Sequence, residues 1–194
     1  MESRRLILAI ALSFLVLVGY QLLFVKKPPQ TVSPAGQIAQ AAAGQAAAAP
    51  QVKFTVDFAA RHDLYLHAHA DDEALEILFR QNPKARIIWA HTGFSTAPEQ
   101  VEAYLQRYPG LWCELSYRYG ITAAGGQLTP EWKRLFEKYP ERFLVGSDTW
   151  VNERWDSYAS IMGGYRQWLA QLSPGVAEQI AFRNAQRLFG KTAP

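Results

Sequence analysis

The chain has 194 residues, with 20 lysine and arginine residues against 17 acidic ones, and its length allows one globular domain plus an appendage. The net charge of +3 resides in residues 1–50, where four basic residues face one acidic residue, so the remainder is neutral. This distribution argues against nucleic-acid binding. The single cysteine, Cys113, excludes an internal disulfide and is expected to be a small core residue.

The first feature along the chain is an uncharged apolar run, Leu6–Val25. A helix with a rise of about 1.5 Å per residue makes this run long enough to cross a hydrocarbon core of about 30 Å. A secretory signal peptide is the alternative, but Lys26-Lys27-Pro28-Pro29 stands where small residues would mark cleavage. The sequence therefore predicts that residues 1–25 are a single-pass membrane anchor in contact with the lipid bilayer. Its two flanks carry similar positive charge, which leaves its orientation open.

The next segment is rich in alanine, proline and glutamine. From Lys26 to Pro50 it contains no aromatic residue, so it cannot bury enough surface to offset the entropy of ordering. We expect a disordered linker over residues 26–56, in which the alanine run could form transient helix.

Beyond the linker, short apolar runs alternate with longer amphipathic stretches, which is typical of βα units and a parallel sheet. The predicted α/β domain covers residues 57–194. Its predicted strands are Leu64–Ala68, Arg86–Ala90, Leu111–Leu115 and Arg142–Gly146. Its predicted helices are Asp72–Arg80, Glu99–Tyr108, Pro130–Tyr139, Pro174–Phe182 and Asn184–Phe189. Thr129 and Ser173 are expected to cap two of these helices through their hydroxyl groups.

Metal-binding residue types follow the predicted strands. His67, His91 and Asp148 stand at or near the ends of three of them, where the side chains of a parallel βα array converge on one face. Imidazole and carboxylate suit zinc, manganese or iron. The alternative for each residue is a structural hydrogen bond or a turn cap.

Three further residues are weaker candidates at this edge. His69 faces the same way as His67 if the strand continues, because side chains two apart share a face. Glu114 lies on the intervening strand and is more often structural in such a place. Arg118 follows that strand and could hold a substrate carboxylate, with a solvent-facing arginine as the alternative.

Several motifs occur in an order that is similar to the carboxyl-terminal half of amidohydrolase-2-type metal-dependent hydrolases. They are Leu66-His67-Ala68, Ile88-Trp89-Ala90-His91-Thr92-Gly93, Glu114-Leu115-Ser116, Arg142-Phe143-Leu144-Val145-Gly146-Ser147-Asp148-Thr149 and Asn184-Ala185-Gln186-Arg187-Leu188-Phe189-Gly190. This resemblance covers about residues 60–190 and implies four βα units of an eight-stranded (β/α)8 TIM barrel. It also implies that His67 and His91 bind metal or polarise the substrate carbonyl, while Asp148 binds metal and shuttles the proton of an activated water.

The first fifty residues resemble a second family, the amino terminus of YidC-type bacterial membrane insertases. The shared features are the start Met1–Phe14, then Gly19-Tyr20-Gln21, then a low-complexity linker. The resemblance implies a bacterial inner-membrane location with the soluble domain on the periplasmic side. No later apolar run is long enough for further membrane helices, so an insertase core is absent.

The motifs together predict a membrane-anchored, amidohydrolase-like protein that hydrolyses or decarboxylates a small carbonyl substrate with a divalent metal, zinc, manganese or iron. A catalytically incomplete, truncated or fused barrel without a metal is the first alternative, and a membrane-insertion or assembly factor is the second. Four strands alone would leave two sheet edges unpaired and the inner face uncovered. A homodimer in which two half-barrels pair to close one barrel is therefore a further alternative.

Overall fold

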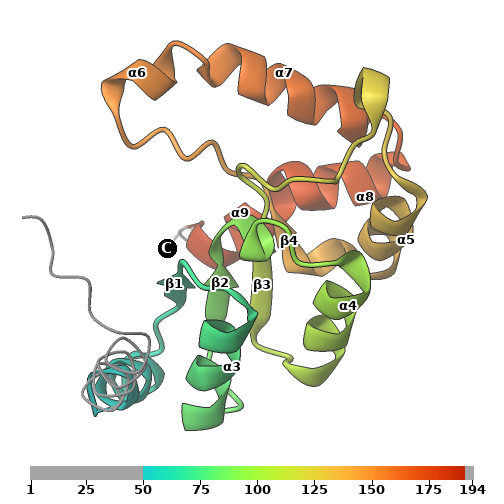
Figure 1. Cartoon of the computed structure of the whole chain (residues 1–194). Helices are drawn as coiled ribbons and strands as arrows, with labels where there is room; N and C mark the ends of the chain where they lie inside the picture. The colour runs from blue at the N-terminus through green and yellow to red at the C-terminus, as the bar shows by residue number, and fades with distance from the viewer. Residues whose placement is uncertain (1–49, 191–194) are drawn as a thin grey trace, which may run out of the picture. The chain divides into compact units, whose positions relative to one another are not determined.

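The protein is described by a computed structural model over residues 50–190, and its centre is a four-stranded parallel sheet. The strands lie side by side in chain order, and Figure 1 shows them as β1 to β4. Their bounds are β1 Leu66–Ala68, β2 Ile87–Trp89, β3 Leu111–Glu114 and β4 Phe143–Leu144. The four predicted strands are thus confirmed in place and order, although each is shorter than predicted. Pairing along β2 stops at Trp89 because the backbone beyond it leaves the extended conformation.

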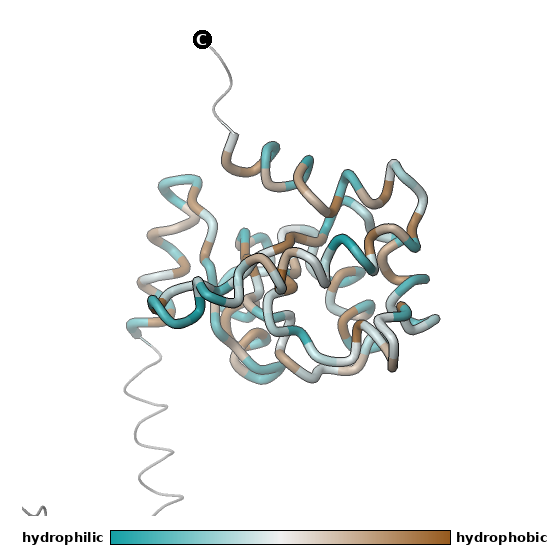
Figure 2. Tube along the Cα trace, turned by 90° about the horizontal axis from the view of Figure 1, so that it is seen from above, coloured by the Kyte–Doolittle hydropathy of each residue, from teal (hydrophilic) through white to brown (hydrophobic). Residues whose placement is uncertain are grey.

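Three helices follow the first three strands: α3 Asp72–Gln81, α4 Pro98–Arg107 and α5 Pro130–Lys138. All three are amphipathic. Figure 2 shows hydrophilic and hydrophobic residues interspersed along the described part of the chain. Asp71 caps α3 by accepting a hydrogen bond from the Ala74 amide at 2.9 Å. The predicted hydroxyl cap at Thr129 is wrong, because its side chain makes no cap hydrogen bond and Pro130 alone favours the start.

The carboxyl-terminal third contains two helices that the sequence analysis missed, α6 Asn152–Trp155 and α7 Tyr158–Leu169. A continuous helical stretch then runs through α8 Pro174–Glu178, the π-helical turn η4 Gln179–Arg183 and α9 Asn184–Phe189. Ser173, like Thr129, makes no side-chain cap. Short 3₁₀ turns are η1 Ala90–Gly93, η2 Ala124–Gly126 and η3 Pro140–Arg142.

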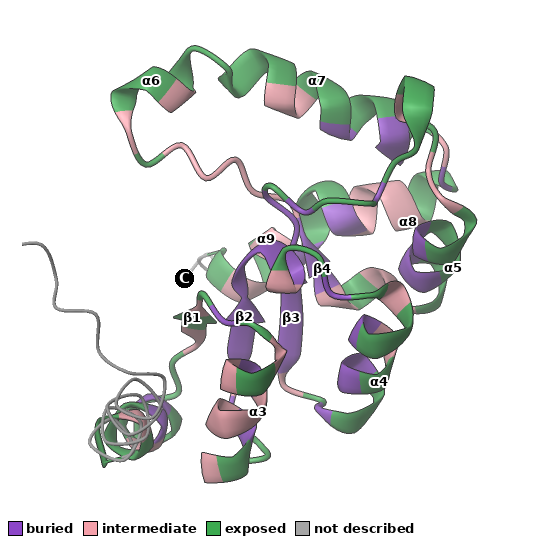
Figure 3. Cartoon of the chain, viewed as in Figure 1, coloured by how far each residue is buried: buried purple, intermediate pink, exposed green. Residues whose placement is uncertain are grey.

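The main core lies between one face of the sheet and the helices. The strand residues that enter it are Ile87, Trp89, Leu111, Cys113 and Phe143. Figure 3 shows β2 and β3 buried, whereas α6 and the first half of α7 are mostly exposed. Cys113 is fully buried, which confirms its predicted place in the core. Burial raises the pKa of its thiol to about 12.

The opposite face of the sheet has a smaller core of its own. Ile88, Trp112 and Leu144 are buried there, and Ala185 and Leu188 of α9 pack against them. The expectation that this inner face would be uncovered is therefore wrong, because the terminal helix takes the place of further strands. The two edges are open as expected, since β1 pairs only with β2, and β4 only with β3, within residues 50–190.

The amino-terminal boundary also differs from the expectation. Residues 50–61 are helical, and Val56 is fully buried, so residues 50–56 belong with the folded part and not with the predicted linker. The predicted anchor Leu6–Val25 and most of the linker lie outside the described residues. Between residues 50 and 190, no helix is both long and apolar enough to span a bilayer.

Candidate active site at the carboxyl edge of the sheet

The segment that follows β2 has an unusual backbone. His91, Thr92, Gly93 and Phe94 all have positive φ, at 56°, 47°, 66° and 60°. Only glycine adopts this region freely, and each other residue costs about 1–2 kcal/mol there. Such strain persists where the surroundings over-determine it, and it concentrates at functional sites. The end of β2 is therefore a candidate site on backbone geometry alone.

Glu114, at the end of β3, is the residue that holds this segment. Its Oε2 accepts hydrogen bonds from the His91 amide at 3.1 Å and the Ser116 hydroxyl at 2.8 Å, and its Oε1 accepts one from the Ser116 amide at 2.7 Å. Its backbone carbonyl accepts the Thr92 hydroxyl at 2.8 Å. A Cβ on Gly146 would overlap Oε1, so the chain after β4 approaches the same carboxylate closely. Glu114 therefore organises the edge, as its structural alternative predicted.

The His91 ring is fixed by a short hydrogen bond. Its Nδ1 lies 2.7 Å from the Ser116 carbonyl oxygen, which can only accept, so Nδ1 carries the proton. Nε2 of the neutral ring then has a lone pair, and no residue of the described chain donates to it. This tautomer can accept a proton or bind a metal. It cannot donate a hydrogen bond to a carbonyl, so the predicted polarising role would require the protonated ring.

Two further imidazoles lie beside His91. The ring centres of His69 and His91 are 4.8 Å apart, and those of His67 and His69 are 6.0 Å apart. His69 is therefore the histidine that lies next to His91. His67 neighbours His69 and is exposed. β1 ends at Ala68, so His69 lies just beyond the strand.

Asp148 is engaged elsewhere. It has a φ of 49°, and its carboxylate forms an ion pair with Arg154 in α6. Among residues 50–190, no group of three histidine, cysteine, aspartate or glutamate side chains is placed to hold one ion. The predicted set of His67, His91 and Asp148 is thus not assembled, and the described residues do not by themselves fit a metal. Instead, the Asp148 carboxylate pairs with Arg154, and His67 is exposed on β1, the edge strand of the sheet.

Arg118 differs from both of its predicted alternatives. It is buried, and its guanidinium donates to the backbone oxygens of Phe94, Thr96 and Tyr119. It also lies 4.7 Å from the centre of the Trp132 ring. Desolvation by burial lowers its pKa to about 10. These bonds hold the end of the strained segment in place, so Arg118 is neither solvent-facing nor free to bind a substrate.

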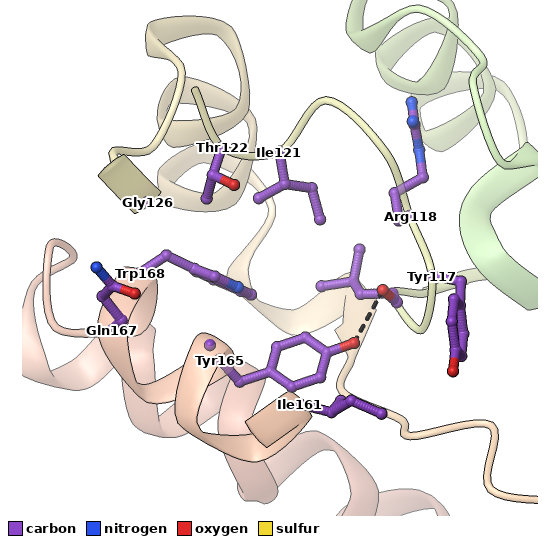
Figure 4. A pocket seen from close by; sticks show the side chains of 11 residues that line it. Tyr117, Arg118, Ile121, Thr122, Gly126, Ile161, Tyr165, Gln167 and Trp168 are labelled. Carbon is purple, nitrogen blue, oxygen red and sulfur yellow. Dashed lines mark hydrogen bonds between the residues drawn. The ribbon is translucent and has the colours of Figure 1, made fainter. Parts of the chain in front are cut away.

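A cavity of about 240 Å³ lies beside this edge, between α7 and the segment that follows β3 (Figure 4). Tyr165 forms one wall, and its hydroxyl contacts the carbonyl oxygens of Leu115 and Gly146, each at 2.9 Å. Burial raises the pKa of Tyr165, so this wall stays uncharged. Tyr117 and Ile161 also line the cavity.

The sequence analysis missed two residues of this site. Ser116 was quoted within a motif but given no role, although its position two residues after Glu114 put it at the strand end. No sequence pattern indicated a role for Arg154, because it lies in a helix of four residues, which is too short to show a periodic pattern.

Comparison with known proteins identifies the family. A family model described as amidohydrolase matches residues 40–191. The fold is also similar to a crystal structure of an amidohydrolase from Burkholderia multivorans with bound zinc, at 21% identity and a TM-score of 0.42, over 72% of this chain and 56% of that chain. The chain thus spans little more than half the length of that protein.

No curated protein matches the chain. Neither the family model nor the solved structure supports the resemblance of residues 1–50 to YidC-type insertases. The family match covers more than three quarters of the chain, including every residue of the site just described. The chain therefore belongs to the amidohydrolase-2 family.

Proposed function

We propose that this chain is a hydrolase, or a decarboxylase, that acts on a small carbonyl compound at the carboxyl edge of its sheet. The observation that carries the proposal is the strained segment at the buried His91, in which Glu114 accepts from the His91 amide and the Ser116 carbonyl fixes the ring so that Nε2 has a free lone pair. A base placed in this way can take a proton from an attacking water.

Asp148 is the second group in the proposed reaction. It lies beyond the end of β4, and its carboxylate could accept a proton once it is no longer paired with Arg154. The predicted zinc, manganese or iron remains part of the proposal only if further ligands join His91, because the described residues do not complete a site. The predicted bilayer contact and periplasmic location likewise remain proposals.

Hydrolysis of neutral lactones by the purified chain tests the proposal. We expect hydrolysis above the buffer rate, with and without added zinc chloride as two arms of the assay. His91→Asn should lower the rate by about a hundredfold or more, because general-base catalysis contributes about 10²–10⁴. His62→Asn is the matched control, since His62 is exposed and outside the site. Equal rates for the His91 variant and the unmodified chain would contradict the proposal.

A second candidate is a catalytically incomplete member of the family. Two observations favour it: the open edges of β1 and β4, and the lack of a three-ligand group within residues 50–190. A folded chain that shows neither hydrolysis nor decarboxylation in either arm would support it. The proposed homodimer is separable from both by sedimentation, because pairing of two copies across the open edges would double the mass in solution.

A further inference from the structure

A groove of about 350 Å³ lies between α7 and the helical stretch that α8 and η4 form. Figure 1 shows α7 above α8, and the turn over residues 170–173 joins them. Arg166 and Leu169 line the groove from α7, whereas Ile161 and Tyr165 of the same helix line the cavity beside the sheet. The groove is therefore separate from the carboxyl edge and shares no residue with the proposed active site.

The lining of this groove is mostly apolar. Leu169 and Leu172 are buried and form its floor, and Phe182, which is 44% exposed, stands at its side. Ala181 and Phe182 belong to η4, and π-helical turns are rare and occur frequently at functional sites. The groove thus offers an apolar surface that a ligand can cover.

Two charged side chains line the groove, and they differ in their partners. Glu178 forms an ion pair with Arg183, with 2.5 Å between the nitrogen and the oxygen. Arg166 is exposed and forms no ion pair within residues 50–190. An apolar surface with one unmatched positive charge beside it complements a molecule that has an apolar body and one negative charge.

We propose that this groove binds a medium-chain fatty acid, with its chain against Leu169 and Phe182 and its carboxylate at Arg166. A cavity of about 150 Å³ holds one benzene molecule, so this groove has room for a body about twice as large, that is, one chain of about eight carbons. The two long chains of a diacyl lipid do not fit. The inference goes beyond the proposed function, because it uses none of the residues of that site.

Photolabelling of the purified full chain tests the proposal. The probe is a medium-chain fatty acid with a terminal diazirine, and mass spectrometry locates the label. We expect label within residues 169–182, and octanoate should displace the probe. Octanol has the same chain without the charge and should compete about tenfold more weakly. Hexanoate should also compete about tenfold more weakly, because it buries two fewer methylene groups. Absence of label from residues 169–182, or equal competition by octanol and octanoate, would overturn the proposal.

Arg166→Gln tests the charged end of the groove. At a probe concentration below saturation, this variant should lower the label within residues 169–182 about tenfold. Arg80→Gln is the matched control, because Arg80 in α3 is also exposed and forms no ion pair within residues 50–190. The control should leave the label unchanged. Equal label in the Arg166 variant and the unmodified chain would overturn the proposal.

Ala181→Phe tests the apolar part, because the larger ring fills the groove. This variant should abolish the label, whereas Ala159→Phe, at an exposed position of α7 outside the groove, should retain it. Sedimentation of the same variants tests a second copy of the chain as the other occupant. A dimer that Ala181→Phe disrupts, together with no label within residues 169–182, would assign the groove to that second copy and overturn the proposal.

Discussion

The two halves of the carboxyl edge are built differently. On the β2–β3 side, His91 is buried and held by bonds to Glu114 and Ser116, and strained backbone is retained there. On the β4 side, Asp148 is partly exposed, and its carboxylate pairs with Arg154 beside exposed aromatic rings. The difference indicates that the histidine is pre-positioned by buried hydrogen bonds, whereas the aspartate is held by a partly exposed ion pair.

The largest expected effect concerns Cys113, which is fully buried in β3 on the side of the edge that carries His91. Burial raises the pKa of its thiol from 9.0 to about 12, so the thiolate fraction at pH 8 falls about a thousandfold. Alkylation by iodoacetamide should therefore be slower by at least that factor in the native chain than in denaturant. Because the unfolded thiol ionises first, this group should also lower the free energy of unfolding as pH rises from about 9 toward 12. Equally fast labelling in both states would show that the β3 side is open.

A substitution in the strained segment, residues 91–94, should have the next largest effect. Gly93→Ala places a Cβ against Trp89 and the Thr96 hydroxyl at a φ of 66°, so it should lower the free energy of unfolding by about 3 kcal/mol. Gly120→Ala is the matched control, because its φ is 79° but no atom lies near its Cβ, and about 1 kcal/mol is expected. Urea unfolding gives both values. Equal losses would mean that packing does not confine residues 91–94.

Loss of the organising carboxylate should cost somewhat less. Glu114→Gln places an amide where two amide donors and a hydroxyl donor converge, so a loss of about 2 kcal/mol is expected. Thermal unfolding monitored by circular dichroism measures it. Glu137→Gln serves as the control, because Glu137 is exposed and forms only a long ion pair, with 3.9 Å between its Oε1 and the Lys133 Nζ. An unchanged melting temperature for the Glu114 variant would contradict its role.

The open side should show the smallest effect. Arg154→Gln breaks a partly exposed ion pair, so the free energy of unfolding should fall by less than about 1 kcal/mol. The same urea titration checks this value. A loss as large as that from Glu114→Gln would show that the pair is a structural element and that the two sides do not differ.

Much of the fold could be predicted because its signals are local. Short apolar runs between amphipathic stretches predicted the four strands and their parallel order, and Pro130 marked a helix start. α7 was missed because Gly163 and Gly164 stand at its centre, where glycine is unfavourable to a helix. The cover of the inner face by α9 depends on tertiary packing and has no local pattern.

The site was predictable only in part. The rule that strand ends converge placed His91 and Glu114 at one edge, and the structure confirms their contact. The same rule could not predict the ion pair between Arg154 and Asp148, because that pair depends on a short helix after an irregular segment. Nor could it predict positive φ at Thr92 and Phe94, since neither residue type favours that conformation.

Hydrogen exchange of individual amides, followed by NMR, tests the difference between the two sides most directly. The amides of His91 and Ser116, which donate to the buried carboxylate of Glu114, should exchange slowly, near the limit set by global unfolding. The amides of Thr149 and Trp150, which have no hydrogen-bond acceptor within residues 50–190, should exchange fast. Similar protection at all four amides would contradict a sheet edge that is fixed at its histidine and open at its aspartate.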